Sequence, residues 1–143
     1  MIAIDTSLLI YAHRSAVKEH RAAQRAIEIA ASDSRGWGIA LASLAEFWSV
    51  VTHAESRGGP STPQEARAFV GGLVEAGAQI WMPQAGFWTR LAQLAVDLDV
   101  RGARVFDLSI ALTAFDGGAT ELWTHDRAFV TLPGLRVVDP IPR

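Results

Sequence analysis

Several acidic residues lie in stretches where a charged side chain is costly. Asp5 ends the apolar run MIAID, and Glu46 interrupts LASLAEFWSVV. Asp107 interrupts VFDLSIALTAF, and Asp126 follows ATELWTH. A carboxylate in apolar surroundings is strongly destabilising unless it is paired, hydrogen-bonded or bound to a cation. Four such residues, each near an expected strand end or helix start, point to one shared acidic pocket.

A pocket of this kind suits a divalent cation, which relieves the repulsion between neighbouring carboxylates. The chain has no cysteine, so its candidate ligands are oxygen atoms, and these favour Mg²⁺ or Mn²⁺ over zinc. Such an ion polarises a phosphoryl oxygen and lowers the pKa of a bound water. The predicted chemistry is metal-dependent hydrolysis of a phosphodiester, with one or two ions.

Each acid also has an ordinary structural explanation. Asp5 fits a helix N-cap, and Ser43 with Glu46 fits a capping box. Asp107 fits the favoured place of an acid in the first turn of a helix, and Asp126 fits a cap of the following turn. The structural interpretation needs four independent explanations for acids that are all expected at the same edge of one sheet. One shared site accounts for the four acids together and is therefore the better interpretation.

The elements that would hold these acids alternate between strands and helices. Strands are expected at residues 1–5, 37–40, 78–82, 121–124 and 135–139. Helices are expected at about 7–14, 17–31, 41–53, 63–75 and 86–99, with a last one ending near 115. This alternation predicts an α/β fold with a mainly parallel sheet between helix layers. Ligands of such sheets bind beyond the carboxyl ends of the strands, where Asp5 is expected.

Local signals refine three of these helices. Thr6 or Ser7 is expected to cap the first one. Thr62 and Glu65 form a capping box at the start of the fourth. The segment 41–53 is apolar on almost every side, so it is expected to be a buried helix.

The bulk composition is that of a folded protein. The chain has 143 residues, half of them hydrophobic and a fifth charged, and is expected to form one domain, 1–143. No apolar run is long enough for a membrane span and the start lacks a signal-peptide layout, so a cytoplasmic location is expected. The net charge is −2, but with the four acids set aside 13 basic residues face 11 acidic ones.

The stretches around the acids resemble PIN-domain ribonucleases, in particular the VapC toxins of bacterial VapBC toxin–antitoxin systems. The resemblance is carried in order by DTS at 5–7, LAEFWSVVT at 44–52, RVFDLSIA at 104–111 and LWTHDRAF at 122–129. These segments span nearly the whole chain. The resemblance implies a three-layer α/β/α sandwich, in agreement with the alternation of elements.

The resemblance also implies roles for the acids. Asp5, Glu46, Asp107 and Asp126 would bind Mg²⁺ or Mn²⁺ and activate water for RNA cleavage. Asp5 and Asp107 would be the central ligands, and the other two would act directly or through water. The implied partners are an RNA substrate, a small VapB-like antitoxin that blocks the site, and a second copy of the chain in a homodimer. The loop SRGGPSTP is expected to contribute to RNA selection.

Several neighbours of the acids are further candidates. Thr6 is predicted to orient Asp5 by a hydrogen bond, and Thr124 to act similarly near Asp126. Ordinary capping explains either hydroxyl equally well. The candidate RNA contacts, for which a solvated surface position is the alternative, are Arg101, Arg104, His125 and Arg127.

Three other functions are conceivable for a chain with clustered acids, and two of them require residues that the chain lacks. A phosphoacceptor domain needs a second early acid and a late lysine, but the chain has only Lys18. A phosphatase of the haloacid-dehalogenase type needs an aspartate at position 7, which is Ser7. A non-catalytic binding module that holds a structural metal stays open as an alternative.

Overall fold

The computed structural model describes residues 1–143 and is built around a five-stranded sheet. Every pair of neighbouring strands is parallel, which confirms the predicted class. The strand order across the sheet is β3 (Gln79–Trp81), β2 (Trp37–Ala40), β1 (Ile2–Ile4), β4 (Glu121–Trp123) and β5 (Arg136–Val138). The order places β1 and β4 side by side in the middle.

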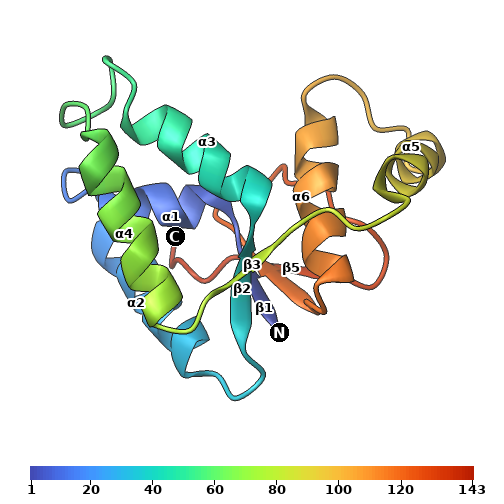
Figure 1. Cartoon of the computed structure of the whole chain (residues 1–143), viewed down its shortest axis with the longest axis horizontal. Helices are drawn as coiled ribbons and strands as arrows, with labels where there is room; N and C mark the ends of the chain where they lie inside the picture. Colours follow the sequence, from blue (N-terminus) through green and yellow to red (C-terminus); the bar gives the residue numbers. More distant parts are fainter.

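Helices cover both faces of the sheet, as expected for a three-layer α/β/α sandwich (Figure 1). One layer contains α1 (Thr6–His13), α2 (His20–Ser32) and α4 (Pro63–Glu75). The other contains α5 (Phe87–Asp97) and α6 (Arg104–Asp116). The helix α3 (Leu41–Val51) continues directly from β2 and packs against α1, α4 and α6. None of the helices has the length and apolar character of a membrane span.

The alternation of side chains along β1 separates two hydrophobic clusters. Ile2 and Ile4 pack into the cluster under α1 and α2, whereas Ala3 packs with Leu108 of α6 on the opposite face. Asp5 is still extended, with φ −82° and ψ 162°. Its side chain therefore follows Ala3 towards α6, because successive residues of an extended chain point to opposite faces.

Helix starts agree only in part with the sequence signals. The capping box of α4 is confirmed, since the Thr62 hydroxyl accepts from the Glu65 N–H (3.1 Å) and the Glu65 carboxylate accepts from the Thr62 N–H (3.0 Å). A cap of α1 by Thr6 or Ser7 is wrong, because the N-cap position is Asp5 and no side chain caps this helix.

The helix α3 differs from the expected buried helix. Only Ser43, Phe47 and Val51 are buried, while Trp48 is 40% exposed. The capping box proposed for Ser43 is also wrong, because α3 already begins at Leu41. The apolar character of this segment comes from two faces: one packs on the protein core, and the other is uncovered in the single chain.

The side chain of Trp81 is enclosed by two glycines from different elements. A Cβ atom on Gly38 of β2 would lie 2.6 Å from the Trp81 ring, and one on Gly117 would lie 2.5 Å from it. Gly117 directly follows α6. The close contact therefore fixes the carboxyl end of α6 against the sheet, and the same helix carries Asp107 at its other end.

We expect Gly117→Ala to lower the free energy of unfolding by about 1–3 kcal/mol, because the added methyl group has no space beside the Trp81 ring. Urea unfolding followed by tryptophan fluorescence measures this change. Gly72→Ala is the matched control: Gly72 lies inside α4 with open space around it, so alanine should be neutral or stabilising. Equal stability of the Gly117→Ala and wild-type proteins would contradict the packing described for Trp81.

Candidate active site

An open pocket of about 400 Å³ lies at the carboxyl edge of the sheet. It brings together all four acids singled out in the sequence. Its lining consists of Asp5, Thr6, Ser7, Ile10, Glu46, Ser49, Val50, Asp107 and Asp126. Residues more than 100 positions apart in the chain thus share one surface depression.

The fold explains why the acids meet there. Asp5 follows β1 and Thr124 follows β4, and these strands are neighbours with Ile4 opposite Trp123. Asp107 lies in the first turn of α6. The carboxyl ends of parallel strands and the amino ends of the helices that follow them lie at one edge of the sheet. This edge is where the pocket forms.

Asp5 is the most buried of the four acids, with 5% of its surface exposed. Its Oδ2 atom accepts a hydrogen bond of 2.7 Å from the Thr124 hydroxyl. Burial raises the pKa of Asp5 to about 6, and the carboxylates of Glu46 and Asp107 add to the rise, although hydrogen bonds from Thr124 and the Thr6 backbone oppose it. The negative charge of ionised Asp5 is therefore not compensated by a nearby positive charge.

The Thr6 hydroxyl has a partner other than the predicted one, whereas the Thr124 hydroxyl contacts Asp126, near which it was expected to act, and Asp5 in addition. Thr6 donates a hydrogen bond of 2.6 Å to Glu46 Oε1 instead of orienting Asp5 through its hydroxyl. Thr124 donates to Asp5 and also accepts the backbone N–H of Asp126 at 3.1 Å. Each hydroxyl therefore connects two of the segments that carry acids.

Asp107 and Asp126 are joined by Arg104, the first residue of α6. The Arg104 Nη1 atom donates to Asp107 Oδ2 at 2.9 Å and to Asp126 Oδ2 at 3.1 Å. Asp126 Oδ1 also accepts the N–H of Ala128 (2.9 Å), so the turn cap suggested for it is present as well. Among the candidate RNA contacts, Arg104 alone reaches the acids of the pocket.

The other candidate RNA contacts lie outside this pocket. Arg101 pairs with Asp99 at 3.0 Å, and its side chain is 83% exposed. His125 and Arg127 line a separate cavity near the carboxyl terminus. These three residues are close to Asp107 or Asp126 in the sequence, but their side chains do not line the acidic pocket.

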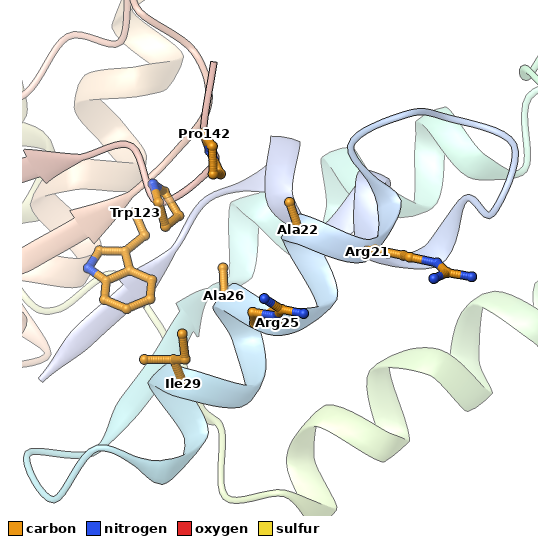
Figure 2. Close-up of a pocket in the computed structure, with 8 residues that line it drawn as sticks. Arg21, Ala22, Arg25, Ala26, Ile29, Trp123 and Pro142 are labelled. Atoms are coloured by element: carbon orange, nitrogen blue, oxygen red, sulfur yellow. The ribbon is translucent and has the colours of Figure 1, made fainter.

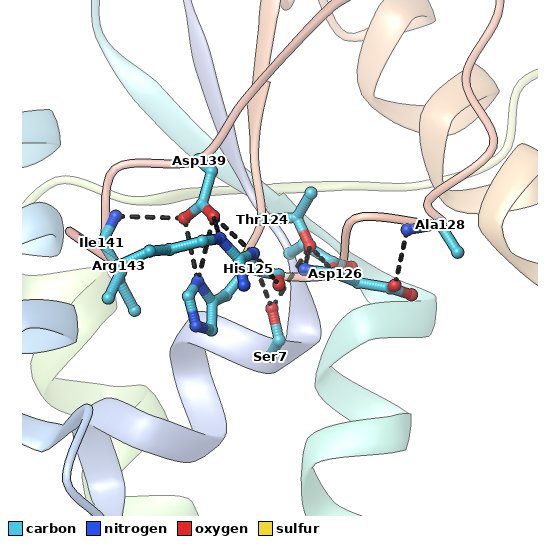
Figure 3. Close-up of polar contacts among 9 residues, drawn as sticks. Ser7, Thr124, His125, Asp126, Ala128, Asp139, Ile141 and Arg143 are labelled. Carbon is cyan, nitrogen blue, oxygen red and sulfur yellow. Dashed lines mark hydrogen bonds and ion pairs between the residues drawn. The ribbon is translucent and has the colours of Figure 1, made fainter.

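Sequence reasoning did not identify the network that supports Thr124 (Figure 3). Ser7 Oγ accepts the N–H of His125 at 3.1 Å and lies 3.2 Å from Thr124 Oγ1. Asp139 accepts from Arg143 (2.7 Å) and lies 2.9 Å from the His125 ring, while Arg143 also donates to the His125 carbonyl (3.1 Å). The carboxyl-terminal tail thereby holds the segment that presents Thr124 to Asp5.

The arrangement of donors fits a hydrated divalent ion better than one chelated fully by protein. No group of three acidic or histidine side chains is close enough to hold one ion as it stands. Mg²⁺ usually keeps several waters and takes one or two carboxylates directly. The pocket provides oxygen donors of this kind, and the buried Asp5 lacks a positively charged partner of its own. The residues present therefore fit Mg²⁺ or Mn²⁺.

A groove of about 500 Å³ adjoins the acidic pocket and shares Ile10, Ser49 and Val50 with it. It extends between α1 and α3 towards the exposed side chains of His53 and Arg57. Because they share these lining residues, the two depressions form one continuous surface.

Another cavity, of about 360 Å³, has a different character (Figure 2). Figure 2 shows Trp123 and Pro142 on one side of it and residues of α2 on the other, with Ile29 among them. Its lining contains no acid and consists of Arg21, Ala22, Arg25, Ala26, Ile29, Trp123, Pro140 and Pro142. Without acidic or nucleophilic groups, this cavity offers no hydrolytic chemistry.

Comparison with known proteins identifies the family of the chain. The PIN domain family model matches residues 2–135. The chain belongs to the PIN-domain family. Ribonuclease VapC43 of Mycobacterium tuberculosis (strain H37Rv) is 33% identical to this PIN-domain chain, over 99% of this chain and 96% of that protein. Ribonuclease VapC48 of the same strain is 30% identical over 73% and 70% of the two chains.

Solved structures show the same fold at lower sequence identity. VapC20 of Mycobacterium tuberculosis, described as a sarcin–ricin loop cleaving toxin, has a TM-score of 0.67 at 17% identity, over 90% of this chain and 92% of that one. VapBC2 of Rickettsia felis, bound to a promoter DNA fragment, has a TM-score of 0.68 at 19% identity, over 96% and 98%. The resemblance to VapC proteins expected from the sequence is thereby confirmed.

The raised pKa of Asp5 predicts how the stability of the metal-free protein depends on pH. Between pH 6 and pH 4, Asp5 is protonated in the folded protein but still ionised in the unfolded chain. Protonation of this group therefore increases the stability of the folded protein as the pH falls. At pH 7 the buried charge opposes folding. We expect Asp5→Asn to stabilise the protein at pH 7 by roughly 1–3 kcal/mol, and this gain should vanish near pH 4.

Urea unfolding in EDTA across this pH range measures the difference. The matched control is Asp97→Asn, because Asp97 is exposed on α5 and does not line the pocket. A gain from Asp5→Asn that is the same at pH 7 and pH 4 would show that burial does not perturb this carboxyl.

Proposed function

We propose that this PIN-domain protein, acting as one domain over residues 1–143, is a metal-dependent endoribonuclease toxin of the VapBC type. The observation that carries the proposal is the convergence of Asp5, Glu46, Asp107 and Asp126 on one open pocket. Its relatives at 30% identity or more are named ribonucleases. Clustered carboxylates with only oxygen donors are suited to the hydrolysis of phosphodiesters.

Asp5 and Asp107 would be the central ligands of Mg²⁺ or Mn²⁺, with Glu46 and Asp126 acting directly or through water. The bound ion supplies a polarised phosphoryl oxygen and a more acidic water. The burial of Asp5 supports this assignment, because a carboxylate whose pKa is about 6 gains most from a nearby cation.

The remaining side chains of the pocket would hold these acids in place. Thr124 orients Asp5, and Thr6 orients Glu46, each through a short hydrogen bond. Ser7 supports the Thr124 segment from α1. The groove between α1 and α3 would guide the RNA strand towards the acids, with Arg57 available at its far end for a phosphate.

Two protein partners belong to the same proposal. VapBC2 of Rickettsia felis is a toxin–antitoxin pair by name, and we expect a small VapB-like antitoxin to cover the acidic pocket of this chain. We also expect a homodimer. Its support is the large apolar side chains left uncovered on α3, α5 and α6, among them Trp88 (73% exposed) and Phe106 (63% exposed).

The proposed site predicts RNA cleavage that requires Mg²⁺ or Mn²⁺ and stops in EDTA. Asp5→Asn and Asp107→Asn should each lower the cleavage rate at least about 100-fold, since loss of a partner of a metal ligand already costs about 10- to 100-fold. Cleavage is measured by mapping RNA 5′ ends after incubation with the purified variants, with Asp97→Asn as the charge-matched control.

Undiminished cleavage by Asp5→Asn would show that the active site lies elsewhere. Mg²⁺ binding by the wild type without cleavage of total bacterial RNA would instead favour the non-catalytic binding module. The phosphoacceptor alternative gains no support, because Lys18 lines a different cavity from the acids.

The role given to Thr124 has a separate test. Thr124→Val keeps the shape of the side chain but removes the hydrogen bond to Asp5. We expect cleavage to fall by about 10- to 100-fold through weaker metal binding, so that excess Mn²⁺ restores part of the rate. Thr89→Val on the exposed surface of α5 is the control. A loss that no metal concentration relieves would show that Thr124 does not act through the metal ligands.

A further inference from the structure

The guanidinium group of Arg104 occupies a bridging position between two of the acids. A single nitrogen, Nη1, lies 2.9 Å from Asp107 Oδ2 and 3.1 Å from Asp126 Oδ2. Asp107 Oδ2 also receives the N–H of Val130 at 3.3 Å. A positively charged donor shared by two carboxylate oxygens stands where a small cation between the same oxygens would stand.

The position of Arg104 in its helix does not explain this placement. Arg104 is the first residue of α6, where the helix dipole disfavours a positive charge. Arg101, three residues earlier, turns outward and pairs only with Asp99. The two acids of the pocket therefore supply the interaction that draws the Arg104 side chain inward.

We propose that Arg104 is an internal counter-ion that competes with the divalent metal for Asp107 and Asp126, and thereby sets the metal concentration at which the site fills. The inference rests on the proposed metal-dependent function. A metal held by Asp107 or Asp126, directly or through water, would compete with the guanidinium for the same acceptor oxygens and would repel its positive charge. Loading of the site would therefore weaken the contacts of Arg104 with these carboxylates.

The exposure of Arg104 and Asp126 to solvent limits how strongly the arginine competes with the metal. The Arg104 side chain is 45% exposed and that of Asp126 is 42% exposed, so solvent weakens their attraction and the arginine leaves readily. Two surface ion pairs of this kind correspond to a change in metal affinity of about three- to tenfold. Arg104 would raise the concentration of metal needed, without preventing its binding.

Titration of Mn²⁺ into the full-length protein, with free Mn²⁺ measured by electron paramagnetic resonance, tests the competition directly and needs no RNA. Arg104→Gln should bind Mn²⁺ about three- to tenfold more tightly than the wild type. Arg101→Gln removes the same charge three positions away and should stay within about twofold of the wild type, since its ion pair is screened by solvent.

A second measurement follows the arginine itself. In side-chain Nε–H spectra of the wild type, the Arg104 signal, assigned by its loss in Arg104→Gln, should shift on saturation with Mg²⁺, whereas the Arg101 signal should not. Unchanged or weaker Mn²⁺ binding by Arg104→Gln overturns the counter-ion role alone. An equal gain in Arg101→Gln also overturns it, because the cause would be net charge. No Mn²⁺ binding by any of the three proteins overturns both this role and the metal-dependent function.

Discussion

The structure depends on holding a carboxylate at the buried carboxyl end of its central strand. Asp5 is 5% exposed and has one hydroxyl donor, Thr124. Burial raises the pKa of Asp5 to about 6, and the nearby carboxylates of Glu46 and Asp107 add to the rise. Stability alone would favour an apolar residue or a paired charge at this position. Two features of the pocket can be understood as responses to this unfavourable charge: the hydroxyl donor Thr124 and the proposed metal.

The parallel topology makes the arrangement possible. Because β1 and β4 are neighbours in the sheet but more than 100 residues apart in sequence, the ends of these two strands bring Asp5 and Thr124 into contact. The tail then holds the segment that follows β4, through the hydrogen bond from Arg143 to the His125 carbonyl. The geometry of one hydrogen bond at the site thus depends on both ends of the chain.

Much of this could be predicted from sequence. The alternation of strand and helix patterns predicts the α/β class, and the acids at strand ends and helix starts predict a pocket, because both depend on local rules and on one general property of parallel sheets. The hydrogen-bond partners of the threonine hydroxyl groups could not be predicted in this way. Thr6 lies next to Asp5 in sequence yet donates to Glu46, 40 residues away, because α3 packs against α1. Asp139 likewise gave no local signal, since its partner His125 is brought to it by the fold.

The helix α3 shows a different limit of sequence reasoning. A helix that is apolar on every side has the same pattern whether it is enclosed in its own core or buried against another chain. In this protein Phe47 and Val51 pack inside, while Leu41, Trp48 and Val50 remain outside. Glu46 lies on the exposed part of the same helix and lines the acidic pocket. Any partner that covers this face of α3 will therefore alter the solvent around Glu46, and lower exposure to water strengthens the attraction between a carboxylate and a cation. A partner that buries the exposed face of α3 would for this reason also strengthen the binding of a metal near Glu46, because both involve the same helix.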